Sequence, residues 1–404
     1  MRAPSSAARK ARGAVAALFF ANGALFANVV PRYPDLKAEL GLSNAALGSA
    51  VAAYGLGAIV VGMAAGVLVS RWGSVRVAPV TSLAIAANLV LLGLAPTWLA
   101  LATALFAAGS LDAIADVANN SHGMRVERRY GRSILNSLHG LWSVGAVLGG
   151  AMGAAAAGLG LALVWHFAVA AGLFAALAVG ASRFLLPGLD DTERPASADV
   201  TPGRRPQLGR PGFARRVLAL GVIAALAQVM EDTGGAWGVV YLREDLGAAA
   251  AVSGLGFVAL QTCQTVGRLL GDRAVSRYGD RAVARAGTAV AGGAMTAALA
   301  LPATASTVLA FGAVGLGIGT LIPASMRTAD NLPGLTPGVG LTMAGTVNRI
   351  AMLAAPPLIG VIADTYGLRA GLLVIPLAAA LVLVLASALP ASSKVPSDYL
   401  SDAP

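Results

Sequence analysis

The sequence predicts an all-α membrane protein with about twelve membrane helices. Of its 404 residues, 57% are hydrophobic and only 12% are charged, and the mean hydropathy is +0.74. A soluble globular chain carries about 25% charged residues. Apolar stretches of about 20 residues, the length that crosses a bilayer, recur along the whole chain. Most of the protein surface is therefore expected to face the lipid bilayer.

The apolar stretches follow one another in a regular series, separated by Pro, Gly or charged residues. The first stretch follows a basic segment, as in a signal peptide, but its length and the many later spans favour an uncleaved first helix. The predicted spans are 13–33, 46–70, 77–95, 98–121, 134–157, 160–186, 214–242, 249–271, 283–301, 304–325, 339–363 and 369–390.

Lys and Arg in the loops predict the orientation, because cytoplasmic loops are enriched in them. If the N-terminus is cytoplasmic, the outer side holds only Arg32, Lys37, Arg243 and Arg369. The inner side then holds the N-terminal cluster, Arg71, Arg76, Arg125, Arg128, Arg129, Arg132, the arginines between Arg183 and Arg216, Arg273, Arg277, Arg281, Arg285, Arg327 and Lys394. We expect a multi-pass protein of the cytoplasmic (inner) membrane with both termini in the cytoplasm. The net charge of +10 reflects this topology, and no nucleic-acid partner is expected.

A polar stretch rich in Pro, Asp and Arg at residues 187–212 predicts a disordered cytoplasmic linker. We expect a six-helix bundle at residues 1–186 and a second one, with a short cytoplasmic tail, at residues 213–404. The halves match at a single constant offset, which places Val69-Ser70-Arg71-Trp72-Gly73 on Val275-Ser276-Arg277-Tyr278-Gly279. A parallel repeat of this kind predicts a site near the midplane, between the halves.

The segment Gly66-Val67-Leu68-Val69-Ser70-Arg71-Trp72-Gly73, followed by Arg76, resembles the Gly-x-Leu-x-Asp-Arg-x-Gly signature of the major facilitator superfamily. Ser70 stands where that family usually has Asp, and the second copy begins with Asp272 in place of Gly. The resemblance covers essentially the whole chain. It implies two pseudo-symmetric six-helix bundles that rock in alternating access, with gating residues at Gly66, Arg71, Gly73, Arg76, Arg277 and Gly279.

The fourth span carries Asp112, Asp116, Asn119 and Asn120 on one helical stripe. Ionisable groups inside a membrane are costly, so they mark a candidate site. Two carboxylates one turn apart repel in a low dielectric, so one of them is a candidate to load and unload a proton. A structural pair bonded to neighbouring helices and direct contact with the solute are the alternatives.

The seventh span carries a second stripe, formed by Gln228, Glu231 and Asp232. Its carboxylates suit a proton, a cation or sugar hydroxyls, or a salt bridge to Arg349 on the eleventh span, beside Asn348. We expect this internal ion pair, with an anionic solute group as the alternative partner of Arg349.

The eighth span places four polar residues on one face. We expect Arg268 and Asp272 to form a structural or gating ion pair, and Gln261 and Thr265 to bind solute. Among the remaining candidates, we expect His139 to be structural rather than a proton shuttle, and His122 and His166 to lie at the membrane interface. Four aromatic residues are expected to be interface anchors rather than stacking platforms: Tyr54, Trp142, Trp237 and Tyr241.

Motifs of other function classes do not occur in the sequence. It has no Gly-x-x-x-x-Gly-Lys loop, no Gly-x-Ser-x-Gly elbow and no His-rich metal pattern, so we expect no ATP-driven step, enzyme activity, metal or cofactor. The single Cys263 excludes a disulfide framework. The expected partners are a small solute, protons and lipid, and we expect a functional monomer.

The polar stretch Asp116-x-x-Asn119-Asn120 is similar to the branch of the superfamily that contains fucose permease and uncharacterised bacterial relatives. That branch implies proton symport of a sugar-like solute. It typically has an acid in helix 1, where this chain has Asn22, so Glu231 or Asp232 is expected to replace it. Drug exporters usually carry Arg in helix 4 and Pro where this chain has Ala154. We therefore expect a proton-coupled secondary transporter of a small polar solute, with proton-driven efflux of drugs or secondary metabolites as the alternative.

Overall fold

The structure is a computed structural model, and it describes residues 5–188, 190, 213–332 and 339–391. These residues are almost entirely helical. The helices of the first half are α1 (Ser6–Ala27), η1 (Val30–Arg32), α2 (Tyr33–Glu39), α3 (Asn44–Trp72), α4 (Ser74–Gly93), α5 (Trp98–Tyr130), α6 (Leu135–Gly158) and α7 (Leu163–Ser182).

The second half is equally helical, and its seventh span contains a π-helical turn, η3. Its helices are α8 (Phe213–Asp232), η3 (Thr233–Trp237), α9 (Gly238–Glu244), α10 (Ala250–Tyr278), α11 (Asp280–Ala300), α12 (Thr304–Ile318), α13 (Leu321–Asp330), α14 (Val339–Tyr366), α15 (Leu368–Leu372), α16 (Val374–Leu385) and η4 (Ala386–Ala388).

The helices confirm the predicted fold class. Among the described residues, 10 helices or runs of consecutive helices are long and apolar enough to cross a membrane. The more polar α10 and α11, of 29 and 21 residues, complete the series of predicted segments in order. Large apolar side chains such as Met63, Trp165 and Leu309 are strongly exposed. They suit a surface that is solvated by lipid tails.

The internal repeat is visible in the backbone. Gly73 and Gly279, which correspond in the two halves, both follow a long helix with positive φ angles of 79° and 82°, a conformation that favours glycine. Gly109 and Gly315 also correspond: a Cβ at Gly109 would collide with the carbonyl oxygen of Tyr54, and one at Gly315 with that of Leu260. Tyr54 and Leu260 are themselves separated by the same offset, so the same helix crossing is built twice.

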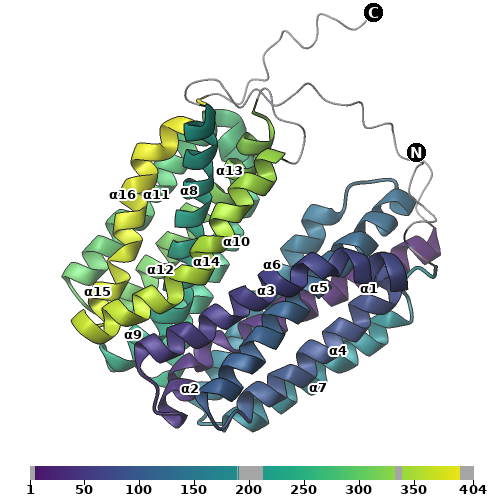
Figure 1. The fold of residues 1–404 in the computed structure, drawn as a ribbon, viewed down its shortest axis with the longest axis horizontal. Coiled ribbons are helices and arrows are strands. Elements are labelled where there is room, and N and C mark those ends of the chain that lie inside the picture. The colour runs from purple at the N-terminus through teal and green to yellow at the C-terminus, as the bar shows by residue number, and fades with distance from the viewer. Residues whose placement is uncertain (1–4, 189, 191–212, 333–338, 392–404) are drawn as a thin grey trace, which may run out of the picture.

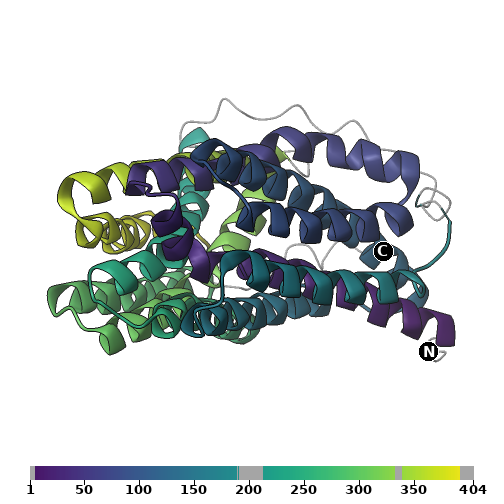
Figure 2. The same cartoon turned by 90° about the horizontal axis from the view of Figure 1, so that it is seen from below.

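Two bundles make up the molecule. Helices α1–α7 gather on one side and α8–α16 on the other, as the colours of Figures 1 and 2 show. The bundles meet where α3 packs along α14, α6 along α10 and α2 beside α9. They diverge towards the face at which α1 and α8 begin and α16 ends, here called the terminal face (Figure 1). Most of the predicted linker lies outside the described residues, so the domain bounds stay a prediction.

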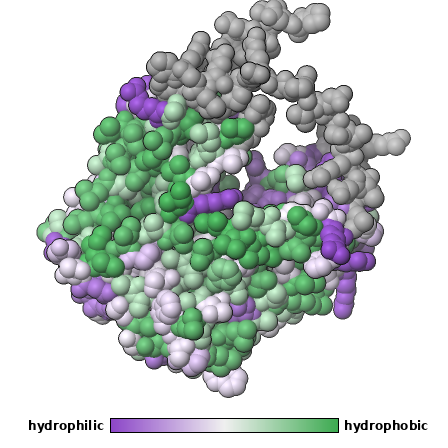
Figure 3. All heavy atoms as spheres, in the orientation of Figure 1, coloured by the Kyte–Doolittle hydropathy of each residue, from purple (hydrophilic) through white to green (hydrophobic). Residues whose placement is uncertain are grey.

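The bundles are closed at the opposite face. Gly48 of α3 lies against the carbonyl of Pro356, and Gly254 of α10 lies against Ala154, with no room for a Cβ at either glycine. Small residues of this kind let helix backbones approach closely. Towards the terminal face the space-filling view is hollowed between the bundles, and hydrophilic residues line the hollow (Figure 3).

Candidate functional site

A cavity of about 330 Å³ lies between the two bundles. Each bundle contributes one wall, as the repeat predicts. The polar side chains in these walls are Tyr33, Tyr54, Asp112 and Trp142 from the first half, and Gln228, Glu231, Asp232, Thr233, Trp237, Gln261 and Arg268 from the second. Four predicted site residues of the second half, Gln228, Glu231, Asp232 and Gln261, therefore share one cavity with Asp112.

Asp112 of α5 is held from several sides within the first bundle. The amide of Asn22 on α1 donates to its Oδ1 at 2.9 Å, and the indole Nε1 of Trp142 on α6 donates to the Asn22 Oδ1 at 2.7 Å. The Tyr54 hydroxyl of α3 lies beside the same carboxylate. Asn22, predicted to lie in the site, thus contacts Asp112 and Trp142.

Glu231 and Asp232 form the acidic part of the second wall. Gln264 of α10 donates to Glu231 at 2.6 Å, and Gln228 of α8, one turn earlier, donates to Asp232 at 2.9 Å. Within the described residues neither carboxylate forms a salt bridge with a basic side chain. The acids on both walls are thus bonded by neutral amides and form no ion pair with a basic side chain of the described residues.

The expected ion pair between Arg349 and these carboxylates is not formed in the described part of the chain. Arg349 is exposed on α14 and lies outside the cavity walls, as does the half-buried Asn348. The other predicted pair, Arg268 with Asp272, is also not formed there. Arg268 instead faces the cavity, whereas Asp272 lies outside its walls in an exposed position. Side chains four residues apart can pair on a helix, but here Arg268 faces the cavity and Asp272 the exposed surface.

Asp116 belongs to a separate polar cluster nearer the terminal face. Its Oδ1 accepts from Asn120 at 2.8 Å, and the Asn120 Oδ1 lies 3.0 Å from the Nε2 of His139. The His139 ring also packs edge-on against Phe19, with centroids 5.1 Å apart. Asn119 and Thr265, predicted to line the cavity, do not. Asn119 is buried inside the bundle, and the Thr265 hydroxyl donates to the Gln261 carbonyl of its own helix.

The prediction that four aromatic residues are interface anchors is wrong. Tyr54, Trp142 and Trp237 line the cavity and Tyr241 is buried, so none of the four is an interface anchor. Phe26 joins them, with its ring centroid 5.7 Å from that of Tyr54 and 6.2 Å from that of Trp142. Sequence reasoning also missed Tyr33 and Phe257, because their helices pack across the bundle boundary and periodicity carries no information on that.

Comparison with known proteins identifies the family. The family model described as Major Facilitator Superfamily matches residues 15–231, more than half of the chain. The chain belongs to the Major Facilitator Superfamily. It is thus a multi-pass membrane transporter, as the polar cavity between two helical bundles suggests.

Three bacterial membrane proteins or transporters match most of the chain. The uncharacterized transporter y4wD of Sinorhizobium fredii is 31% identical over 376 residues, which is 93% of this chain and 97% of that protein. An uncharacterized MFS-type transporter of Yersinia pestis is 28% identical over 351 residues, covering 87% and 88% of the two chains. Membrane protein MosC of Rhizobium meliloti is 28% identical over 362 residues, covering 90% and 86%.

Solved structures show the same fold at low sequence identity. The nucleoside transporter NupG superposes with a TM-score of 0.72 at 16% identity, over 93% of this chain and 97% of NupG. A bacterial homolog of the human lysosomal transporter Spinster gives a TM-score of 0.70 at 13% identity, over 95% and 98% of the chains.

The superfamily loop signature lies at the terminal face. Gly73 makes the turn between α3 and α4, and Gly279 makes the equivalent turn between α10 and α11. The signature arginines Arg71, Arg76 and Arg277 are exposed, as is Gly66, and their gating role stays a prediction. Ser70, at the position of the missing acid, donates to the Val67 carbonyl of its own helix.

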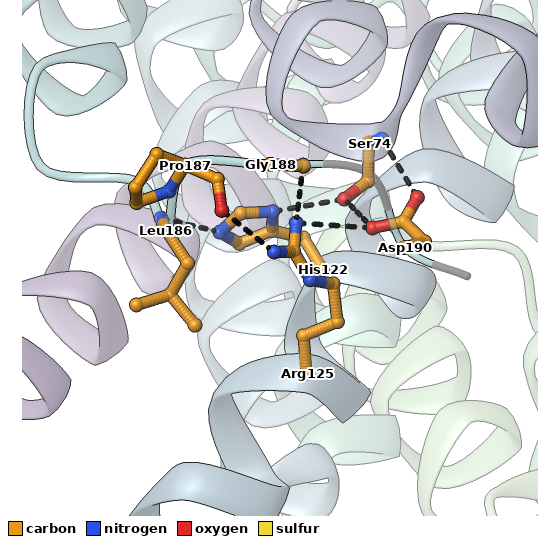
Figure 4. Close-up of polar contacts among 7 residues, drawn as sticks. All are labelled: Ser74, His122, Arg125, Leu186, Pro187, Gly188 and Asp190. Carbon is orange, nitrogen blue, oxygen red and sulfur yellow. Dashed lines mark hydrogen bonds and ion pairs between the residues drawn. The ribbon is translucent and has the colours of Figure 1, made fainter. Parts of the chain in front are cut away.

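An acid from elsewhere occupies the neighbourhood of this loop. Asp190, beyond the end of α7, receives the backbone N–H of Ser74 at 2.8 Å, the Ser74 hydroxyl at 2.7 Å and the Arg125 guanidinium at 3.1 Å (Figure 4). Arg125 also donates to the carbonyls of Pro187 and Gly188. The segment that leads into the predicted linker is thereby fixed to the first turn of α4 and to α5.

His122 completes this network and corrects a prediction. The residue is fully buried, not interfacial, and so is His166. The Leu186 N–H donates to the His122 Nε2 at 3.1 Å, so in the neutral ring the proton sits on Nδ1, 2.9 Å from the Ser74 hydroxyl oxygen (Figure 4). His166 lies at the other end of the bundle, between Asn28 and Arg32.

The opposite face is latched by polar contacts between the bundles. Both Asp364 oxygens, on α14, accept backbone N–H groups of Asn44 and Ala45 at the start of α3, at 2.8 Å each. Lys37 of α2 and Glu244 of α9 form a salt bridge of 2.5 Å. The cavity is therefore shut on this side and open towards the terminal face.

Proposed function

We propose that this chain is a proton-coupled secondary transporter of a small polar organic solute, working by alternating access. The observation that carries the proposal is the position of Asp112 in the cavity wall. Asp112 lies in the wall of the cavity between the bundles, bonded to Asn22 and beside Tyr54, without a basic partner among the described residues. A carboxyl group so placed has to be neutralised before the walls can close on it, and a proton does this at low cost.

Asp112 replaces the Asp112–Asp116 pair as the proposed proton-coupling group of the first half. Asp116 is exposed and lies outside the cavity walls. Glu231 and Asp232 remain candidates on the other wall.

We further propose that the protein lies in the cytoplasmic membrane with its terminal face inward. The signature arginines lie at this face, in agreement with the enrichment of cytoplasmic loops in basic residues. The cavity then opens to the cytoplasm, and Asp364 and Glu244 belong to the outer gate. The bundles of residues 1–186 and 213–404 rock about the cavity as a monomer.

The solute has to satisfy aromatic and polar walls together. Rings of Phe26, Tyr54 and Trp142 suit the flat apolar face of a sugar or a base, and amides such as Gln261 suit its polar groups. That NupG carries nucleosides makes nucleosides and sugars the first solutes to try.

Flux in proteoliposomes tests the proposal. A thermal-shift panel of sugars, nucleosides, organic acids and drugs first selects a ligand, because binding to the folded state raises the melting temperature. An inward-directed proton gradient should then drive accumulation of that ligand. Asp112→Asn should abolish this accumulation and spare counterflow, and Asp116→Asn should retain both. Gradient-driven accumulation by Asp112→Asn at the parental rate would exclude Asp112 as the coupling group.

The direction of the gradient effect separates uptake from export. Solute accumulation driven by an inward proton gradient supports symport. Exchange in which an outward solute flux consumes the gradient would establish the alternative, proton-driven efflux of drugs or secondary metabolites.

A further inference from the structure

The second wall of the cavity is built around a π-helical turn. Between α8 and α9 the backbone of Thr233–Trp237 is π-helical, and Glu231 and Asp232 immediately precede it. Such turns are rare in proteins, and many of those that occur lie at functional sites. A Cβ at Gly234 would lie 2.6 Å from the Leu260 side chain, so packing against α10 keeps this turn in place.

Trp237 ends the π-helical turn and lines the cavity. The residue is 2% exposed, and its indole Nε1 is buried without a hydrogen-bond partner among the described residues. A ligand in the cavity therefore meets the aromatic ring of Trp237 and not its N–H.

The acids of this wall have no basic partner among the described residues. Glu231 and Asp232 are adjacent carboxyl groups, and the side chains that donate to them within the described residues are the neutral amides of Gln264 and Gln228. Other ionisable groups facing the cavity are Asp112, Tyr33, Tyr54 and Arg268. Arg268 forms no ion pair with any carboxylate of the described residues.

Aromatic rings line the same cavity as the carboxylates. The Phe257 ring lies at van der Waals distance from Gly235, 3.5 Å from the place that a Cβ would take, and Trp237 lies at the end of the same turn. Rings beside carboxylates are the usual surroundings of a bound organic ammonium group.

We propose that Glu231, Asp232 and Trp237 form the solute-binding subsite, and that the solute carries a protonated amine. The amine lies against the two carboxylates, beside the Trp237 ring. The inference rests on the proposed transport function, since it names the class of solute. The proton binds to Asp112 on the other wall. One proton and one ammonium group are therefore bound in the same transport cycle.

Charge-matched ligands test this inference on purified full-length protein in nanodiscs. Each of two sets compares an amine with a neutral and an acidic relative of similar size: glucosamine, glucose and glucuronate, and ethanolamine, ethylene glycol and glycolate. We expect the amine of at least one set to raise the melting temperature in a saturable way, and the neutral and acidic members to leave it unchanged. Equal stabilisation by a neutral or acidic member, or no shift with either amine, would overturn the inference.

Variants assign the effect to the subsite. Glu231→Gln and Asp232→Asn should each weaken the apparent affinity for the amine about tenfold or more, because each removes a charged hydrogen-bond acceptor. Trp237→Phe keeps an aromatic ring in the cavity wall and should change this affinity less than either acid variant does. Asp272→Asn, which removes an exposed carboxylate outside the cavity, should bind as the parent does. Parental affinity in both acid variants would contradict the assignment, and if one variant fails to fold, the other two decide.

Binding and flux of the parent protein separate this inference from the proposed function. Amine binding without any proton-driven flux in the parent would refute the transport mechanism alone. Proton-driven flux of a neutral solute that is unchanged in Glu231→Gln and Asp232→Asn would refute the subsite alone.

Discussion

The Asp190 carboxylate receives both the backbone N–H and the hydroxyl of Ser74, at 2.8 and 2.7 Å, at the first residue of α4. A carboxylate at this place satisfies an unpaired N–H of the first helical turn and interacts favourably with the helix dipole. Its Oδ1 also pairs with the buried Arg125 at 3.1 Å. In the second half the acid is part of the helix itself, since Asp280, which corresponds to Ser74 in the repeat, pairs with Arg327 at 2.8 Å.

Asp190→Asn should destabilise the first bundle by about 2–3 kcal/mol, because it removes the ion pair between Asp190 and the buried Arg125 guanidinium. The expected readout is a lower melting temperature of the purified protein. Asp272→Asn removes an exposed carboxylate and serves as the control, with an unchanged melting temperature. An Asp190→Asn protein that melts with the parent would show that the network does not anchor this segment.

The repeated helix crossings give a steric prediction. Gly109→Ala and Gly315→Ala each place a methyl group on a carbonyl oxygen of the neighbouring helix, at Tyr54 and Leu260. Overpacking of this kind costs about 1–3 kcal/mol, so both variants should melt at lower temperature. Gly172→Ala in α7 meets nothing within 4 Å and should melt like the parent or slightly higher. Equal melting temperatures for all three variants would contradict the close approach.

The sequence was sufficient for the fold because hydropathy and the constant offset between the halves are properties of the chain itself. These two patterns predict the helix order and the repeat. The π-helical turn was not predicted, since it depends on how Gly234 packs against Leu260, a contact that no local pattern encodes.

The faces of the helices were predicted less well than the helices. Asp112 and Asp116 share a helical stripe, yet only Asp112 lines the cavity, because the neighbouring helices limit the cavity to part of that stripe. Arg268 and Asp272 separate in the same way. Asp190, which bonds to Ser74 at the start of α4, lies far along the sequence, so no motif could connect the two residues.

The hydrogen bonds of Asp364 at the opposite face should influence the balance between molecules that are closed and molecules that are open at this face. Asp364→Ala removes both acceptors for the N–H groups of Asn44 and Ala45, which join α14 to the start of α3. We expect the opposite face to open in a larger fraction of molecules. Spin labels at Glu39 and Arg369, both exposed near this face, should report a longer distance in a Cys263→Ser background. An unchanged distance distribution would show that the apolar contacts alone hold this face closed.

Trp142 offers a test of how Asp112 is positioned. Its indole N–H donates to the Asn22 oxygen at 2.7 Å, which turns the Asn22 amide nitrogen towards Asp112. Trp142→Phe keeps the aromatic wall and releases Asn22, so its amide can rotate and present oxygen to the carboxylate. A hydrogen bond of this kind is worth about 1 kcal/mol, so proton-driven accumulation should fall about fivefold to tenfold, with counterflow of the same ligand retained. Trp98→Phe is the matched control, because it deletes an indole N–H bonded to the Ala46 carbonyl outside the cavity. Equal losses of accumulation in the two variants would mean that the effect comes from helix packing, whereas a loss confined to Trp142→Phe assigns it to the orientation of Asn22 at Asp112.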